Sequence, residues 1–173
     1  MRIELESLEG TDGRFAQTYE PGQLTLSDER VHLAQPAKVT GRIRQANGQV
    51  VVKGQISSLI QIECDRCLKF VEMPVEATFN LEYVTPQTYE TRRAAELSER
   101  DMALSVFDGE AIDIDELVGE QLLLALPSRV LCQEVCKGLC PVCGADRNLA
   151  DCACEPSEVD PRWTALKELV NGK

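Results

Sequence analysis

The sequence predicts an α+β fold, in which an antiparallel sheet with a long helix and a C-terminal helix is stapled by zinc–cysteine clusters. Apolar and polar residues alternate through residues 37–84, two later segments have helical spacing, and eight cysteines form four close pairs. The chain is long enough to form one domain with its own core, and we expect a single domain that spans residues 1–173. Its expected parts are a β-rich part, a polar loop, a helix, a cysteine-rich zinc segment and a C-terminal helix, over residues 1–84, 85–111, 112–131, 132–155 and 156–173.

Three strands are predicted between residues 37 and 84, after a weakly patterned start with a candidate strand at FAQTYE and turns at EPGQ and LSDE. In KVTGRIRQ, Val39 and Ile43 alternate with basic and polar residues, and the Asn-Gly of ANGQ is a strong hairpin signal. The alternation continues through VVVKGQISSLIQIEC and VEMPVEATFNLEYV. Pro74 falls on the outward register, which is typical of an edge strand or a bulge. We therefore expect an antiparallel sheet with one buried face.

The helices follow a segment, 85–111, that has no steady period and is expected to be a polar loop with room for a short helix. Asp113 and Glu116 form a capping box, and Pro127 stops the helix that they begin. Its expected apolar face consists of Leu117, Val118, Leu122, Leu124 and Ala125. The last helix is expected to start at Asp160 and Pro161 and to end at Gly172, with a buried stripe of Trp163, Leu166, Leu169 and Val170.

The cysteine pairs have the spacing of zinc ligands, because zinc prefers four thiolates and a short loop supplies two of them. Cys140, Cys143, Cys152 and Cys154 lie within fifteen residues, so we expect them to close one site locally. The other site would then join Cys64 and Cys67 to Cys132 and Cys136. The alternative group of Cys136, Cys140, Cys143 and Cys152 would leave Cys132 and Cys154 unused. Either way the chemistry is that of zinc, and the first grouping predicts two ions.

An enzyme is not expected. A catalytic zinc keeps an open position for water, whereas two four-cysteine sites use all eight thiols. His32, the single histidine of the chain, lies between Val31 and Leu33 and is expected to be a surface or packing residue. The segment after Cys67 is a predicted strand, which differs from the helix of a thioredoxin motif. No glycine-rich phosphate loop is present.

The charge of the chain is −11, which argues against non-specific binding to DNA or RNA. Residues 30–69 nevertheless hold seven basic and two acidic side chains. No apolar run approaches the roughly 20 residues of a membrane helix, and the start, MRIELESLEG, lacks the apolar core of a signal peptide. We therefore expect a cytoplasmic protein with reduced thiols and with neither a membrane nor a DNA partner.

Four motifs in order, IECDRC, GEAIDIDELVGEQLLLALPSRVLC, CKGLCPVCGADRNLADCAC and DPRWTALKELV, resemble the YceD family of large ribosomal RNA subunit accumulation proteins. The resemblance covers about the last two thirds of the chain. It implies a role in the accumulation or processing of 23S ribosomal RNA or its precursor, and in assembly of the large ribosomal subunit. No enzymatic activity is implied. The partners implied are this RNA, large-subunit ribosomal proteins, or both.

Candidate RNA-binding residues lie on the predicted sheet and beside the first cysteine pair: Lys38, Arg42, Arg44, Lys53, Arg66 and Lys69. The outward residues of the sheet could take several phosphates. Alternatively, Glu72, Glu76 and Glu82 could pair with Arg42 and Arg44 across the sheet. Arg66 and Lys69, like Lys137 and Arg147, could instead offset thiolate charge.

Two other functions stay open. The chain could be an adaptor that binds a basic ribosomal protein through its acidic surface, without contact to RNA. It could also be a redox sensor in which oxidation of zinc-bound thiolates releases the metal.

Overall fold

The computed structural model describes residues 1–5, 12–46, 49–93, 104–155 and 162. Its chain forms two compact units, whose ranges are Met1–Glu63 with Phe70–Val130 for the first, and Cys64–Lys69 with Leu131–Lys173 for the second. The predicted C-terminal helix at 156–173 lies outside the described residues, apart from Arg162.

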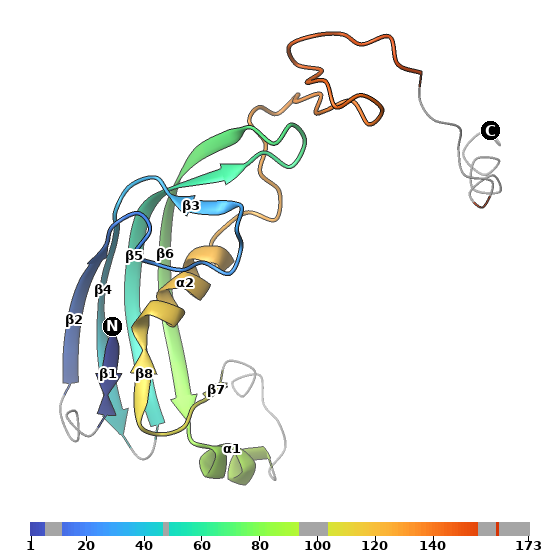
Figure 1. Cartoon of the computed structure of the whole chain (residues 1–173). Coiled ribbons are helices and arrows are strands. Elements are labelled where there is room, and N and C mark those ends of the chain that lie inside the picture. Colours follow the sequence, from blue (N-terminus) through green and yellow to red (C-terminus); the bar gives the residue numbers. More distant parts are fainter. Residues whose placement is uncertain (6–11, 47–48, 94–103, 156–161, 163–173) are drawn as a thin grey trace. The chain divides into compact units, whose positions relative to one another are not determined.

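The first unit is built on a sheet with the strand order β2-β4-β5-β6-β7, and β3 also pairs with β5 (Figure 1). The strands of this sheet are β2 (Asp12–Tyr19), β3 (Val31–Leu33), β4 (Ala37–Ala46), β5 (Gln49–Glu63), β6 (Phe70–Val84) and β7 (Leu104–Val106). All pairs are antiparallel except β6 with β7. A separate antiparallel pair consists of β1 (Arg2–Glu4) and β8 (Ala111–Asp113).

The three predicted strands are confirmed as β4, β5 and β6, with one face buried along each of them. The β4–β5 pairing ends at Ala46 and Gln49, as a two-residue hairpin requires, and the Asn-Gly turn itself lies outside the described residues. Pro74 stands opposite Leu59, whose carbonyl accepts hydrogen bonds from the backbone of Ala34 and Gln35 on the far side. Leu59 therefore requires no N–H from residue 74, and β6 is an edge strand along this stretch.

A row of two phenylalanines and two glycines crosses the buried face. Phe15, Gly41, Gly54 and Phe79 stand directly opposite one another on β2, β4, β5 and β6. A Cβ atom on Gly41 would lie 2.3 Å from the Phe15 ring, and one on Gly54 would lie 2.4 Å from the Phe79 ring. Each ring thus covers the glycine beside it, which explains the break that Gly54 makes in the apolar alternation.

The predicted helix over 112–131 is shorter than expected, since α2 covers Ile114–Leu124 with Asp113 as its N-cap. The Asp113 carboxylate accepts hydrogen bonds from the backbone N–H groups of residues 115 and 116, as predicted. Ile112 belongs to β8 instead of the helix. The helix ends before Pro127, which cannot donate a backbone hydrogen bond. Leu124 is therefore at the last turn and 77% exposed, so its placement on the apolar face was wrong, as was that of Ala125.

The segment 85–111, expected to be a polar loop, holds the helix α1 (Pro86–Arg93) and the strand β7 in its described part. No helix within the described ranges is long and apolar enough to cross a membrane.

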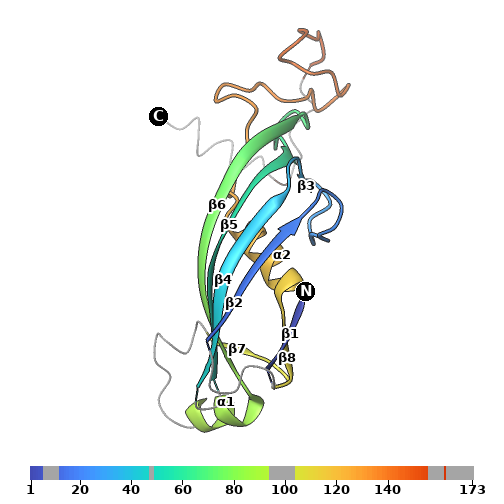
Figure 2. The same cartoon turned by 90° about the vertical axis from the view of Figure 1, so that its left-hand side faces the viewer.

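The layers of the first unit leave one face of the sheet open. In both views α2, β1 and β8 lie on the same side of the sheet (Figures 1 and 2). Leu117, Val118 and Leu122 of α2 pack there into the same core as the inward side chains of β4 and β5. The polar residues of β2, β4 and β5 on the opposite face are exposed, and no described element of this unit covers them.

Candidate metal centres

Site 1 consists of Cys64, Cys67, Cys132 and Cys136, whose four sulfur atoms all lie within 4.8 Å of one another. The Sγ atoms of Cys64 and Cys136 are 3.9 Å apart, and those of Cys67 and Cys132 are 3.5 Å apart. A disulfide bond requires about 2.05 Å. Four thiolates around zinc at about 2.3 Å stand about 3.8 Å from one another. The spacing at site 1 therefore fits a tetrahedral metal ion and does not fit a disulfide.

Site 2 consists of Cys140, Cys143, Cys152 and Cys154, which form a second group of four close sulfur atoms. The structure thus groups the eight cysteines in the two sets expected from local closure, and the alternative set around Cys136 is wrong. The sites differ in exposure: three of the four cysteines of site 1 are buried, whereas only Cys140 is buried at site 2. Both sites lie within the second unit.

The two Cys-x-x-Cys loops adopt the same turn. The N–H of Cys64 donates to the carbonyl of Lys69 at 2.8 Å, and the N–H of Cys140 donates to that of Ala145 at 2.8 Å. The fifth residue is left-handed in both loops, with φ values of 60° at Leu68 and 73° at Gly144. Glycine was expected at such a position, and leucine there is strained by about 1 kcal/mol or more. In each loop this turn brings the two cysteine sulfur atoms together and directs backbone N–H groups toward the sulfur of the first cysteine, as in a metal-binding knuckle.

The backbone around the first cysteine of each loop favours the thiolate. Hydrogen bonds from the backbone N–H groups of Cys143 and Val142 lower the pKa of Cys140 to about 6. Burial raises the pKa of Cys64, but backbone hydrogen bonds from Arg66, Cys132 and Cys67 outweigh it and lower that pKa to about 6 as well. A thiol whose pKa lies below neutral pH is already deprotonated at neutral pH, so it binds a metal ion at little cost.

The second unit has no apolar core among its described residues, 64–69, 131–155 and 162. Its buried side chains there are four cysteines, Cys64, Cys67, Cys136 and Cys140. A segment of this length cannot offset its conformational entropy without burying apolar surface or binding a metal ion. The residues present therefore fit a unit in which metal–thiolate bonds take the place of a core.

Polar groups around site 1 hold its ligands in place. Asn148 donates from Nδ2 to the sulfur of Cys136 at 3.4 Å, and its Oδ1 accepts from the N–H of Lys137 at 2.8 Å. Arg66 donates to the carbonyl of Cys136. Lys69 forms an ion pair with Asp146 at 2.8 Å, which raises the pKa of Lys69 and lowers that of Asp146.

The candidate RNA-binding residues fall into two places. Lys38, Arg42, Arg44 and Lys53 lie together on the open face of the sheet in the first unit. Arg66 and Lys69 belong to the second unit, where both side chains have the partners just described. Arg44 forms an ion pair with Asp12 of β2 at 3.5 Å, a partner that the sequence did not suggest. Sequence reasoning also missed Arg14, which stands directly opposite Arg42.

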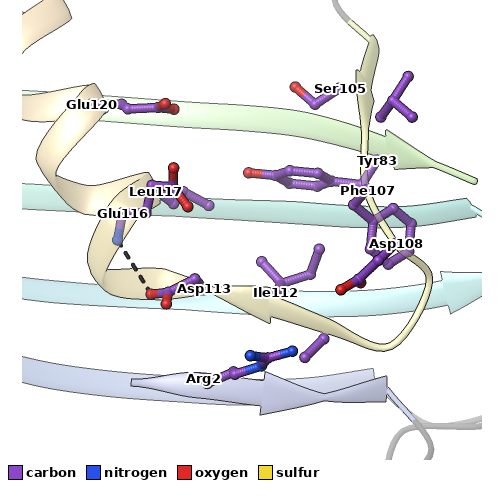
Figure 3. Close-up of a pocket in the computed structure, with 12 residues that line it drawn as sticks. Arg2, Tyr83, Ser105, Phe107, Asp108, Ile112, Asp113, Glu116, Leu117 and Glu120 are labelled. Atoms are coloured by element: carbon purple, nitrogen blue, oxygen red, sulfur yellow. Dashed lines mark hydrogen bonds between the residues drawn. The ribbon is translucent and has the colours of Figure 1, made fainter.

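A pocket of about 440 Å³ lies between β6, β7, β8 and α2 in the first unit (Figure 3). The Tyr83 hydroxyl points toward α2 in it (Figure 3), and burial, with the charges of Glu120 and Glu116, raises the pKa of Tyr83 to about 12. Asp108 and Asp113 add to the acidic lining, whereas Arg2 is the one basic residue among the described residues that line the pocket. This pocket does not suit a phosphate group.

The fold and the two sites define a class of protein. It is an α+β protein with one unit built on a sheet and a second unit that contains two four-cysteine clusters. The family model described as "Large ribosomal RNA subunit accumulation protein YceD" matches residues 52–170. The chain belongs to the YceD family. The family name implies a role in accumulation of the RNA of the large ribosomal subunit and names no catalysed reaction.

Relatives of the chain occur in several bacteria. It is 27% identical to the protein YlbN of Bacillus subtilis over 157 residues, which cover 90% of this chain and 87% of YlbN. It is 30% identical to the protein Rv2926c of Mycobacterium tuberculosis over 133 residues, which cover 75% of this chain and 59% of that protein. The chain therefore spans about three fifths of the length of the mycobacterial relative. No solved structure matches the chain.

Proposed function

We propose that site 1 and site 2 each bind one zinc ion. Eight sulfur donors with tetrahedral spacing favour zinc, because the hard ions magnesium and calcium prefer oxygen ligands. All four positions around each ion are taken by thiolates, so both ions have a structural role and neither presents an open position to a substrate. The metal supplies folding free energy to the second unit, on the order of 10 kcal/mol per site at neutral pH.

We propose further that the chain is a non-enzymatic zinc-binding factor for the accumulation and processing of 23S ribosomal RNA, and hence for assembly of the large ribosomal subunit. The observation that carries this proposal is the family match over 52–170, because that range includes all eight cysteines. Such a factor acts by binding RNA or a large-subunit ribosomal protein. We place it in the cytoplasm, where reducing conditions keep the thiols available to zinc.

The test is the ratio of 23S to 16S ribosomal RNA in cells that lack the chain. We expect the ratio to fall and to be restored by the wild-type chain. Cys64→Ser with Cys67→Ser is expected not to restore it, because site 1 then keeps only two thiolates. Val142→Ser changes an exposed residue of the same unit and is the matched control that should restore the ratio. An unchanged ratio in the deleted cells would contradict the proposed function.

A second candidate is an adaptor that binds a basic ribosomal protein without contact to RNA. The acidic pocket around Glu116 and Glu120 favours it, since a lysine or arginine side chain complements such a lining. Binding of the purified chain to ribosomal proteins and to 23S fragments, each over a salt series, separates the two functions. Binding to proteins alone would favour the adaptor.

A further inference from the structure

Three cations stand in one row across the open face of the sheet. Arg14 of β2 lies directly opposite Arg42 of β4, and Arg42 lies directly opposite Lys53 of β5. All three are exposed, and none has an ion pair or side-chain hydrogen bond with the residues that the structure describes. The row continues on β6 with Asn80, which is uncharged. We call Arg14, Arg42 and Lys53 the basic row.

We propose that the basic row binds the phosphate backbone of a single strand of RNA. This inference rests on the proposed function for its choice of RNA and on the geometry of the sheet for its residues.

Like charges placed directly opposite on neighbouring strands are destabilising, so the basic row lowers the stability of the sheet. Other cations on the same face have an acidic residue in their own row. Arg44 stands opposite Asp12 and pairs with it at 3.5 Å. Lys38 stands opposite Ser57, which stands opposite Glu76. An anion bound across the basic row would supply the missing counter-charge.

The surface around the basic row suits a phosphate. The three cations border a shallow hollow that also includes Thr40, Gln55 and Thr78. These three residues form the next row along the strands and are uncharged. Their hydroxyl and amide groups can donate hydrogen bonds to phosphate oxygens. Among the residues that the structure describes, no carboxylate lines this hollow.

The width of the row favours one RNA strand over a duplex. Neighbouring strands lie about 4.8 Å apart, so three adjacent strands span about 10 Å. A stacked nucleic-acid strand has a phosphate about every 3.4 Å, so the row faces about three nucleotides. Domains that bind double-stranded RNA contact two grooves over about 16 base pairs, far beyond this length. Phe15 also lines the hollow, but its ring lies over Gly41 in the buried-face row, so the contact is to phosphates and is independent of base sequence.

The test measures the affinity of the full zinc-loaded chain for a labelled 12-nucleotide single-stranded RNA by fluorescence anisotropy, over a salt series. Three phosphate contacts predict a slope of log Kobs against log salt of about −2. Arg14→Gln with Arg42→Gln is expected to leave a slope of about −0.7 and to weaken binding at low salt. Lys38→Gln with Arg44→Gln removes the same charge from the same face and is the matched control. The sequence made these two residues RNA-binding candidates as well, but each has an acidic residue in its own row, so the variant is expected to stay near wild type.

Equal losses in the two double variants would overturn the proposal, because the effect would then follow net charge and not the row. Tighter binding of duplex RNA, or of a polyglutamate peptide, would overturn it as well. Thermal unfolding verifies that each variant is folded, and the single variant Lys53→Gln, with an expected slope change of about 0.7, provides an independent reading. A normal 23S to 16S ratio in cells without the chain would contradict the proposed function and would leave the RNA affinity as measured, so the two failures are distinguishable.

Discussion

Replacement of Gly138 by alanine tests how site 1 is assembled. Gly138 lies two residues after Cys136, is buried, and has a φ of 74°. A Cβ atom there would lie 2.9 Å from the carbonyl oxygen of Arg66, inside the Cys64–Cys67 loop. That oxygen accepts the N–H of Leu139 at 2.9 Å, so it cannot move away without loss of a hydrogen bond. The added methyl group would therefore push apart the two halves of site 1.

The magnitude follows from two costs. The left-handed conformation costs alanine about 1–2 kcal/mol, and overpacking against backbone costs about 1–3 kcal/mol. Alanine recovers about 0.4–1 kcal/mol by restricting the unfolded chain. A net loss of about 2–3 kcal/mol predicts that Gly138→Ala weakens metal binding at site 1 by about 30- to 150-fold.

Gly144 is the matched control, because its φ is 73° but no atom lies within 4 Å of the added Cβ. Gly144→Ala should weaken site 2 by about 1 kcal/mol or less, which is at most about fivefold. The assay is competition with a colorimetric zinc chelator under reducing conditions, followed as two release steps. Wild-type affinity of Gly138→Ala, or equal losses in both variants, would refute the steric account of site 1.

Three more predictions concern stability and metal release. Gly54→Ala should destabilise the first unit by about 1–3 kcal/mol, because its Cβ would meet the Phe79 ring. Gly119→Ala should stabilise it by about 0.5–1 kcal/mol, because the Cβ added to α2 would make only ordinary van der Waals contacts, at 3.5 Å to the Thr25 carbonyl oxygen and 3.7 Å to Leu26. Thermal unfolding measures both changes. The Met1 ammonium and then the Tyr19 hydroxyl lower the pKa of Asp115 from its ordinary 3.8, so its stabilisation is present above that value and lost as pH falls through the lowered pKa. Acid titration of Asp115→Asn should show a shallower loss than wild type, and an identical curve would exclude the contribution. A chelator should remove metal from site 2 first, because the thiols of site 2 are more exposed than those of site 1. Native mass spectrometry of variants that keep only one site measures the order of release. Earlier loss from site 1 would refute this prediction.

Much of the sheet and the grouping of the cysteines could be predicted from local pattern. Alternation identified β4, β5 and β6, because a half-buried strand must present apolar side chains at every second residue. The two cysteine clusters followed from the close spacing of Cys140 to Cys154, which left the remaining four cysteines to form the other cluster. The N-cap Asp113 was predictable because a cap depends on local residues alone.

The features missed depend on contacts between distant parts of the chain. β7 has three residues, too few for a period, and its parallel pairing with β6 follows from tertiary structure. Arg14 could not be assigned to the basic row, because the sequence of either segment alone does not predict the register in which β2 pairs with β4. Leu68 occupies a left-handed position at which the sequence pattern favours glycine, and the proposed metal–thiolate bonds would offset this strain.

The central claim is that metal ions bound by eight thiolates take the place of an apolar core in the second unit. Native mass spectrometry of the reduced chain, purified without added metal, tests it most directly. The account predicts a mass increment of two zinc ions per chain. Acidification should remove both ions as the eight thiolates take up protons. A folded chain that carries no zinc, or a single ion shared among the eight cysteines, would contradict the account.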